Sequence, residues 1–173
     1  TFQMLFDRNV AMKSKSFAIG VRAEHRQDMI DEAMYGRKER GPLGAAAYKL
    51  TAQLENGRGV YTFCMCPGGY VVNASSEQGR LAVNGMSYHD RAGENANSAV
   101  IVTVTKDDYG SDHPLAGMEF QRRLEKKAWE EGGGNVPIQR FADFCTGTIS
   151  VKTGNVTPNI KGKYVFGNVR NIF

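Results

Sequence analysis

The fold of this chain is decided by the stretch YTFCMCPGGYVVNASSEQGRLAVNGMSYHDRAGENANSAVIVTV, Tyr61 to Val104. Runs of β-branched and aromatic residues alternate in it with Pro-Gly-Gly, Asn-Gly and other polar turn residues. Gly and Asn adopt the positive φ that tight turns need, and Pro has its own φ fixed at a value that suits the first central position of a turn. The stretch therefore predicts short strands joined by tight turns.

The flanking sequence adds more strands and a few helices. Residues His113 to Glu131 have apolar side chains at helical spacing and are followed by three glycines, which predicts one long helix. Shorter helices are predicted at 27–35 and 141–144, and strands at 17–21, 46–54, 60–66, 70–74, 81–83 and 100–105. We expect an α+β fold, an antiparallel, barrel-like β-meander with one long helix and one or two short ones.

Length and composition predict one globular domain. The chain has 173 residues, 41% hydrophobic and 23% charged, and we expect a core over 17–152 with an extended tail at 153–173. The net charge of +4 comes from scattered Lys and Arg, which gives no case for nucleic-acid binding. No apolar run approaches the ~18–20 residues of a membrane span.

The termini and the cysteines add two expectations. Three cysteines without a signal peptide predict reduced thiols and a cytoplasmic location. The chain begins at Thr1 rather than at a methionine, so we expect it to be part of a longer protein.

Cys64 and Cys66 flank Met65 on a predicted strand. On a regular strand the two thiols point to one face, where a disulfide is poorly placed, so no redox pair is expected. Cys66 is the catalytic candidate, and a nearby base, His25 or His89, would have to lower its pKa. The alternative is that both thiols are small buried apolar side chains.

The turn Pro67-Gly68-Gly69 permits a ligand to approach the backbone closely, because glycine lacks a Cβ. A plain hairpin turn is the alternative. Neither GxGxxG nor GxxxxGK[ST] occurs, so the chain has no nucleotide fingerprint. No His or Cys spacing fits a zinc site, and we expect no metal.

Two polar segments supply the remaining candidates. Amides and hydroxyls fix a polar ligand by directed hydrogen bonds, and His89 can act as an acid or base near neutral pH. The predicted substrate-facing residues are Asn84, Met86, Ser87, Tyr88, Asn95, Asn97 and Ser98, joined by Arg22, Glu24 and His25 at a strand end before a helix. The alternatives are a loop held by local hydrogen bonds and a surface charge cluster.

Four segments together resemble a known family. They are GVRAEHRQ (Gly20–Gln27), YTFCMCPGGYVV (Tyr61–Val72), VNGMSYHDRAGENANSA (Val83–Ala99) and LAGMEFQRRLEKKAW (Leu115–Trp129). They resemble the uncharacterised NAD(FAD)-utilising dehydrogenases, relatives of the flavoproteins with two dinucleotide-binding domains. The resemblance covers about residues 17–144 and implies that the chain is the middle, inserted domain of such a protein.

The resemblance carries expectations about cofactor and partner. It implies FAD in the parent protein, held by an FAD-binding domain of the same parent chain, with NAD(P)H as an electron partner. Cys64 to Gly69 and Asn84 to Ser98 would line the cavity over the flavin, while this chain alone would not bind FAD tightly.

The expected function is that of a substrate-binding or cap domain of an FAD-dependent oxidoreductase. It would act on an unidentified small molecule and be inactive alone. A standalone module that binds a small ligand or a protein, without catalysis, is the alternative. An excised domain also predicts an exposed apolar docking face and self-association through it.

Overall fold

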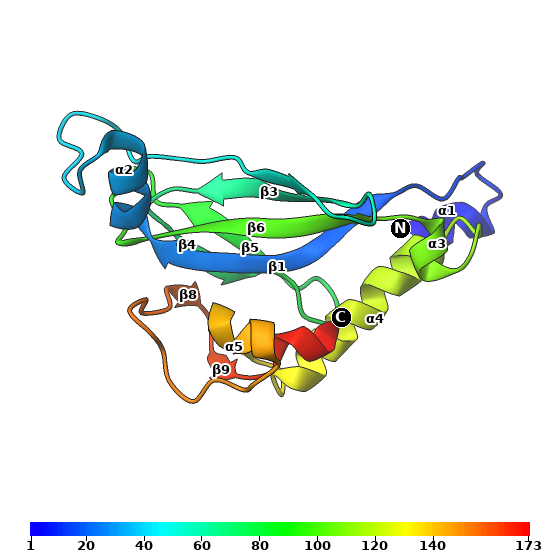
Figure 1. The fold of residues 1–173 in the computed structure, drawn as a ribbon. Coiled ribbons are helices and arrows are strands. Elements are labelled where there is room, and N and C mark those ends of the chain that lie inside the picture. The colour runs from blue at the N-terminus through cyan, green and yellow to red at the C-terminus, as the bar shows by residue number, and fades with distance from the viewer.

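The main sheet has four antiparallel strands in the order β1-β6-β3-β2. The computed structural model describes residues 1–173. The long central pair is β1 (Phe17–Arg26) and β6 (Asn95–Val104), which lie side by side over ten residues (Figure 1). The other two strands are β3 (Gly59–Cys66) and β2 (Thr51–Gln53).

Two smaller sheets bring the C-terminal segment back to the centre of the chain. One has the order β5-β4-β8, from β5 (Val83–Ser87), β4 (Gly69–Asn73) and β8 (Ile160–Lys161). The other pairs β7 (Val136–Ile138) with β9 (Tyr164–Phe166). The pairs β4–β8 and β7–β9 are parallel, which the long connections between their strands permit.

The helices lie at the two ends of the main sheet and below it (Figure 1). The longest is α4 (Ala116–Glu131), and α2 (Gln27–Tyr35) follows β1 directly. The short ones are α1 (Phe2–Asp7), α3 (Lys106–Tyr109), α5 (Phe141–Thr146) and the 3-10 helix η1 (Val169–Ile172). None of the helices has the length and apolar character needed to cross a membrane.

A small apolar core holds α4 against the C-terminal segment. Ala128 on α4 packs with Leu81, Val136 and Ile172, all of which are buried. Ile172 lies in η1, so residues 153–173 contribute β8, β9 and one member of this core.

The α+β class, the antiparallel strands and the long helix are confirmed. The helix begins at Ala116 rather than His113, because residues 113–115 form a turn in which the backbone N–H of Leu115 donates to His113 Nδ1. There are also more short helices than the one or two expected.

The barrel-like meander is wrong, since the strands form separate sheets and close no barrel. Two features explain the difference. β1 is followed by α2, so it pairs with the distant β6 instead of the next strand in the chain. The chain also leaves the main sheet after Cys66 and starts β4 in a second sheet.

The predicted polar loop around Asn95 is also wrong. Asn95 to Ser98 form the start of β6 and are buried, with Asn95 opposite Arg26 and Ser98 opposite Ala23. Asn and Ser favour turns in isolation, but here the ladder with β1 takes up their backbone groups. Conversely, only Thr51–Gln53 of the predicted strand 46–54 are paired.

Candidate functional site

Arg22 joins the two larger sheets through one guanidinium group. Its Nη1 donates to Asn97 Oδ1 at 2.7 Å and to the Cys64 carbonyl at 3.2 Å, and its Nη2 lies 3.3 Å from Asn84 Oδ1. These residues come from β1, β6, β3 and β5. We call Arg22, Cys64, Asn84 and Asn97 the Arg22 seam. Gly85 permits the close approach, because a Cβ there would lie 2.0 Å from Asn97 Oδ1.

The hydrogen bonding and charge of the seam are incomplete. Asn97 is fully buried, and its Nδ2 has no hydrogen-bond partner. A buried donor left without an acceptor costs about 1–3 kcal/mol. Arg22 takes part in no salt bridge, so its positive charge faces only neutral oxygen acceptors. Such a cluster is suited to receive an anionic group.

A β-bulge shapes the cysteine segment. Phe63 lies opposite Ala99 and Cys66 opposite Asn97, so β3 carries one extra residue between them. Cys64 has φ 49 and is exposed, whereas Cys66 is buried and its thiol donates to the Cys64 carbonyl at 3.3 Å. The prediction of a regular strand with both thiols on one face is therefore wrong at this point.

The environment of Cys66 acts on its pKa in two directions. Burial raises the pKa of the Cys66 thiol most, and the neighbouring Cys64 thiol raises it further. The Arg22 guanidinium opposes both by lowering this pKa, because a positive charge favours the thiolate. The two thiols and the guanidinium thus lie close enough to influence one another.

Glu24 and Asn95 meet the C-terminal segment. Glu24 Oε1 accepts from Asn95 Nδ2 at 2.9 Å and from the backbone N–H of Asn159 at 2.8 Å. Burial raises the pKa of Glu24, and these two hydrogen bonds lower it in part. Asn159 also lies 3.5 Å from the hydroxyl of Tyr88, whose ring is 5.7 Å from Lys161 Nζ.

Asn159 and Lys161 were missed by the sequence analysis. They lie in the segment expected to be an extended tail, and no motif marks them. Together they lower the pKa of Tyr88, Asn159 by a hydrogen bond and Lys161 by a hydrogen bond and its charge.

Backbone carbonyls of the chain itself, and not a ligand, occupy the space beside Gly68 and Gly69. Gly68 has φ 50, and a Cβ on it would lie 2.0 Å from the Arg91 carbonyl oxygen. A Cβ on Gly69 would lie 2.1 Å from the Met86 carbonyl oxygen. Pro67, Gly68 and Gly69 are all buried. Their backbone is therefore closed by the protein, and these residues do not fit the pyrophosphate of a dinucleotide.

The two candidate histidines lie in different surroundings. His25 Nε2 is 2.7 Å from the Tyr48 hydroxyl, and burial lowers the pKa of His25. His89 lies exposed in the turn after β5, and its side chain makes no hydrogen bond. No hydrogen bond joins either histidine to Cys66, so the structure does not assemble a thiol–imidazole pair.

The other predicted substrate-facing residues are divided between surface and interior. Met86 is exposed and Ser87 is half-buried. Ser98 is fully buried, and its hydroxyl donates to the carbonyls of Phe63 and Ala99 at 3.4 and 3.2 Å. Ser98 therefore holds the strand that leads into the bulge.

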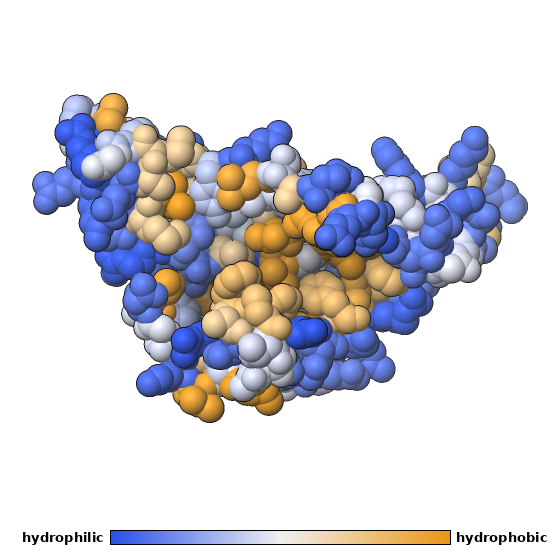
Figure 2. Space-filling model, in the orientation of Figure 1, coloured by the Kyte–Doolittle hydropathy of each residue, from blue (hydrophilic) through white to orange (hydrophobic).

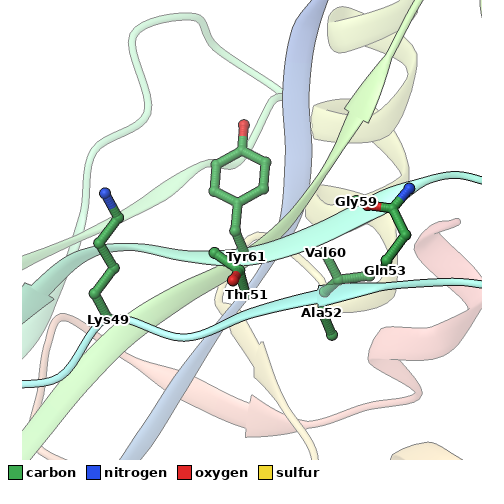
Figure 3. A pocket seen from close by; sticks show the side chains of 7 residues that line it. All are labelled: Lys49, Thr51, Ala52, Gln53, Gly59, Val60 and Tyr61. Carbon is green, nitrogen blue, oxygen red and sulfur yellow. The ribbon is translucent and has the colours of Figure 1, made fainter.

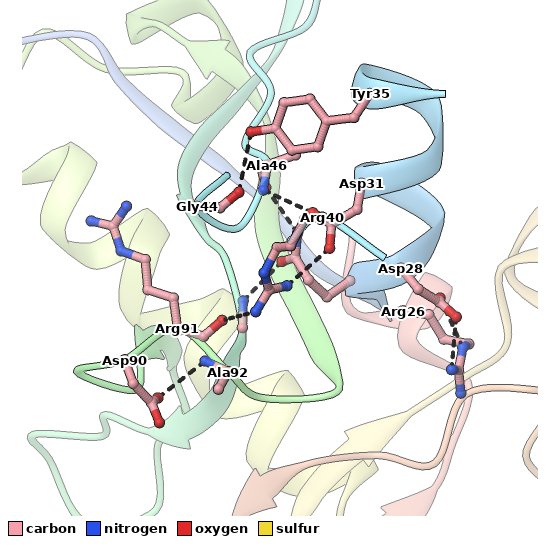
Figure 4. A network of polar contacts seen from close by, with 12 residues as sticks. Arg26, Asp28, Asp31, Tyr35, Arg40, Gly44, Ala46, Asp90, Arg91 and Ala92 are labelled. Atoms are coloured by element: carbon pink, nitrogen blue, oxygen red, sulfur yellow. Dashed lines mark hydrogen bonds and ion pairs between the residues drawn. The ribbon is translucent and has the colours of Figure 1, made fainter. Parts of the chain in front are cut away.

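A second polar network lies at the start of α2 (Figure 4). Asp31 is almost fully buried and accepts from the backbone N–H of Ala46, from Gln27 Nε2 and from Arg40 Nη1, all within 2.9 Å. We call Gln27, Asp31, Arg40 and Ala46 the Asp31 network. Two side chains of the network also hold the turn at Gly68. Gln27 accepts from the Gly68 N–H, and Arg40 donates to the Arg91 carbonyl.

The Asp31 carboxyl is held in its charged form. Burial alone raises its pKa, but the hydrogen bonds from Ala46, Gln27 and Arg40 outweigh burial, and the pKa of Asp31 is lowered.

A groove of about 470 Å³ lies elsewhere on the molecule. Figure 3 shows it along the edge hairpin of β2 and β3, between Lys49 and Tyr61. None of the predicted site residues lines it, so the groove is separate from the Arg22 seam. No group of three or more His, Cys, Asp or Glu side chains is arranged to hold a metal ion.

A sequence model of the family described as "FAD-dependent protein, C-terminal domain-like" matches residues 16–173. The chain belongs to this family. An uncharacterised protein of Clostridium beijerinckii is 51% identical over 174 residues, which cover 98% of this chain and 33% of that protein. The chain thus spans a third of the length of this relative.

An apolar patch lies on and beside α5 in this member of the family. The side chains of Phe141 and Val151 are 82% and 86% exposed, and Ile149 is also exposed. The backbone N–H of Arg140 donates to Ser150 Oγ at 2.8 Å, which brings the two ends of this segment together. We call Phe141, Ile149 and Val151 the α5 patch. Figure 2 shows further apolar surface in the hollow between the main sheet and the C-terminal segment.

Proposed function

We propose that this chain is the substrate-binding or cap domain of an FAD-dependent oxidoreductase, inserted in a longer parent protein. The observation that carries the proposal is the Arg22 seam, an unbalanced positive charge with an unpartnered buried amide beside the exposed thiol of Cys64. Unsatisfied groups of this kind are rare in folded proteins and mark places where a ligand completes the site.

The family and the relative support a parent with FAD. The family is described as that of FAD-dependent proteins, and the relative has room for further domains because this chain covers a third of it. The closed backbone at Gly68 and Gly69 agrees with FAD being held by another domain of the parent. In the proposal the Arg22 seam faces that domain and binds an anionic group of the substrate.

The α5 patch is the proposed docking surface for the FAD-binding domain. A fully exposed Phe or Val side chain gains about 1.5–3 kcal/mol when it is buried, so Phe141 and Val151 favour a covering partner. The occupant we propose is the remaining part of the parent, which the length of the relative leaves room for. Without that part, the same patch would promote self-association of the isolated chain.

The direct experiment is to produce the longer parent protein and this chain separately and to measure bound FAD by absorbance after gel filtration. We expect FAD with the parent and none with the chain alone. Reduction of the bound flavin by NADH or NADPH then tests the oxidoreductase class. A parent without FAD would contradict the proposal and favour the standalone binding module.

Substitutions test the docking surface. Phe141→Asp with Val151→Asp should weaken the association of this domain with the rest of the parent, measured by protease cleavage of the connecting segments. Leu43→Asp is the matched control, since Leu43 is exposed in a loop away from α5. Equal cleavage in both variants would show that the α5 patch does not dock.

A further inference from the structure

We propose that Cys64 and Cys66 are a reversible redox pair that forms a disulfide by exchange with a small anionic disulfide bound at Arg22. This goes beyond the proposed function, because it needs no flavin and assigns both a reaction and a substrate class to the seam. It also reverses the expectation, drawn from a regular strand, that the two thiols cannot pair.

The bulge supplies the geometry. Three residue steps on β3, from Phe63 to Cys66, lie opposite two steps on β6, from Ala99 to Asn97. An extended chain would cover about 10 Å in three steps, but the ladder leaves room for only about 7 Å. The segment is therefore contracted, and Cα atoms two residues apart come within the range of about 4.4–6.8 Å that disulfides use.

The side chains agree with this contraction. The Cys66 thiol turns back toward Cys64, with its sulfur 3.3 Å from the Cys64 carbonyl oxygen. Cys64 has φ 49 and is exposed, and Arg22 fixes its backbone by donating to the same carbonyl. The pair thus has one exposed and one buried thiol, the arrangement expected of an attacking and a resolving cysteine.

The reaction balances without another oxidant. The Cys64 thiolate attacks one sulfur of the small disulfide, the S–S bond of the small molecule breaks, and its first thiolate leaves. The Cys66 thiolate then attacks Cys64 in the mixed disulfide and expels the second thiolate. The protein loses two protons and two electrons, and the small molecule gains them as two thiols.

Arg22 selects the substrate and positions the bulge. It contacts the Cys64 carbonyl and has no carboxylate partner, so it attracts a disulfide that carries carboxylates. Asn84 is exposed beside it and adds an amide at the mouth of the seam. Arg22 acts here as a positioning residue, since the bonds that break and form lie between sulfur atoms.

The test uses the reduced 173-residue chain and glutathione disulfide as the probe, with free thiols alkylated and counted by mass spectrometry. We expect Cys64 and Cys66 to be lost together and Cys145, exposed on α5, to remain. In Cys66→Ser a glutathione adduct should persist on Cys64, and Cys64→Ser should react slowly. A persistent adduct on the unmodified chain, or a bond to Cys145, would overturn the redox pair.

Two controls distinguish an effect on the thiol reaction from a loss of the fold and test the role of the Arg22 charge. Circular dichroism checks that each Ser variant keeps the fold of the unmodified chain, and Cys145→Ser should react as that chain does. Arg22→Gln should slow the reaction with glutathione disulfide several-fold more than it slows the reaction with cationic cystamine, because only the first reagent loses an attracting charge. Equal slowing with both reagents, or no slowing with either, would overturn the assignment of an anionic substrate. A redox pair in a chain whose parent lacks FAD would keep this inference and remove the proposed function.

Discussion

The Arg22 seam and the Asp31 network are both polar clusters near the junction of β1 and α2, but they differ in completeness. In the network, Asp31 is paired with Arg40 at 2.9 Å and accepts two further hydrogen bonds. In the seam, Arg22 has no carboxylate and Asn97 Nδ2 has no acceptor. The charge and hydrogen bonds of the Asp31 network are satisfied within the chain, while those of the Arg22 seam are not.

The difference distinguishes polar groups that stabilise the fold from polar groups that are available to bind a ligand. A buried network whose members are all satisfied rigidifies a fold, and here it holds the turn at Gly68. An unsatisfied cluster costs free energy in the isolated chain and is retained where a ligand or partner completes it. The comparison therefore assigns folding to the Asp31 network and binding to the Arg22 seam.

The largest expected effect is the loss of the Asp31 carboxylate. Asp31→Ala should lower the free energy of unfolding by about 3 kcal/mol, because it leaves Arg40 and the Ala46 N–H without their acceptor. Urea unfolding followed by circular dichroism measures it. If Asp31→Ala were no more damaging than Arg22→Gln, the contrast between the two clusters would fail.

The Gly68 turn should be nearly as sensitive. Gly68→Ala should cost about 2–3 kcal/mol, since Gly68 has φ 50 and its new Cβ would collide with the Arg91 carbonyl. Gly36→Ala is the matched control, because Gly36 has φ 70 and nothing within 4 Å of a Cβ, and we expect about 1 kcal/mol there from the left-handed backbone alone. Equal losses in urea unfolding would refute the close approach at Gly68.

Arg22→Gln should have a smaller effect on stability. The guanidinium is half-buried and its acceptors are neutral, so we expect a loss of about 1 kcal/mol in urea unfolding. The same substitution should slow the exchange of the thiols with an anionic disulfide several-fold. A loss as large as that of Asp31→Ala would place Arg22 in the scaffold and not in the site.

The pH dependence of stability should distinguish Glu24 from Asp31. The pKa of Glu24 is raised above 4.5 in the folded chain, so its contribution to stability falls as pH rises through the window above 4.5. The pKa of Asp31 is lowered below 3.8, so its contribution is present above 3.8 and is lost as pH falls through the folded-state value.

Glu24→Gln is the smallest of the expected changes at neutral pH. It keeps an oxygen for Asn95 and Asn159 and removes the burial cost of the charge, so unfolding near pH 7 should change little. It should abolish the fall in stability above pH 4.5, whereas Asp31→Asn should leave that fall intact. Urea titrations at several pH values test both, and the opposite assignment of the two slopes would contradict these pKa directions.

Local pattern predicted the elements, and long-range pairing decided their arrangement. The period of α4 and the junction of β1 with α2 are set by neighbouring residues, and both were predictable. The pairing of β1 with β6 joins residues far apart in the sequence, so the open sheet could not be told from a barrel.

The sequence indicated which residues belong to the site but not how they are arranged or what each one does. Arg22, Asn84, Asn97 and Cys64 were all singled out from the sequence, but their convergence depends on a bulge that no local motif marks. Asn159 reaches Glu24 and Tyr88 because the C-terminal segment returns beside β4, where β8 pairs with it in parallel.

The most direct test of a site completed by the rest of the parent is the rate at which iodoacetamide alkylates Cys64, compared between this chain and the longer protein. Cys145 on α5 serves as the second reporter, since it is exposed in the chain and adjoins the α5 patch. We predict that both thiols react readily in the chain and are protected in the parent, where the FAD-binding domain covers the seam and the patch. Equal alkylation rates in the two proteins would contradict this prediction.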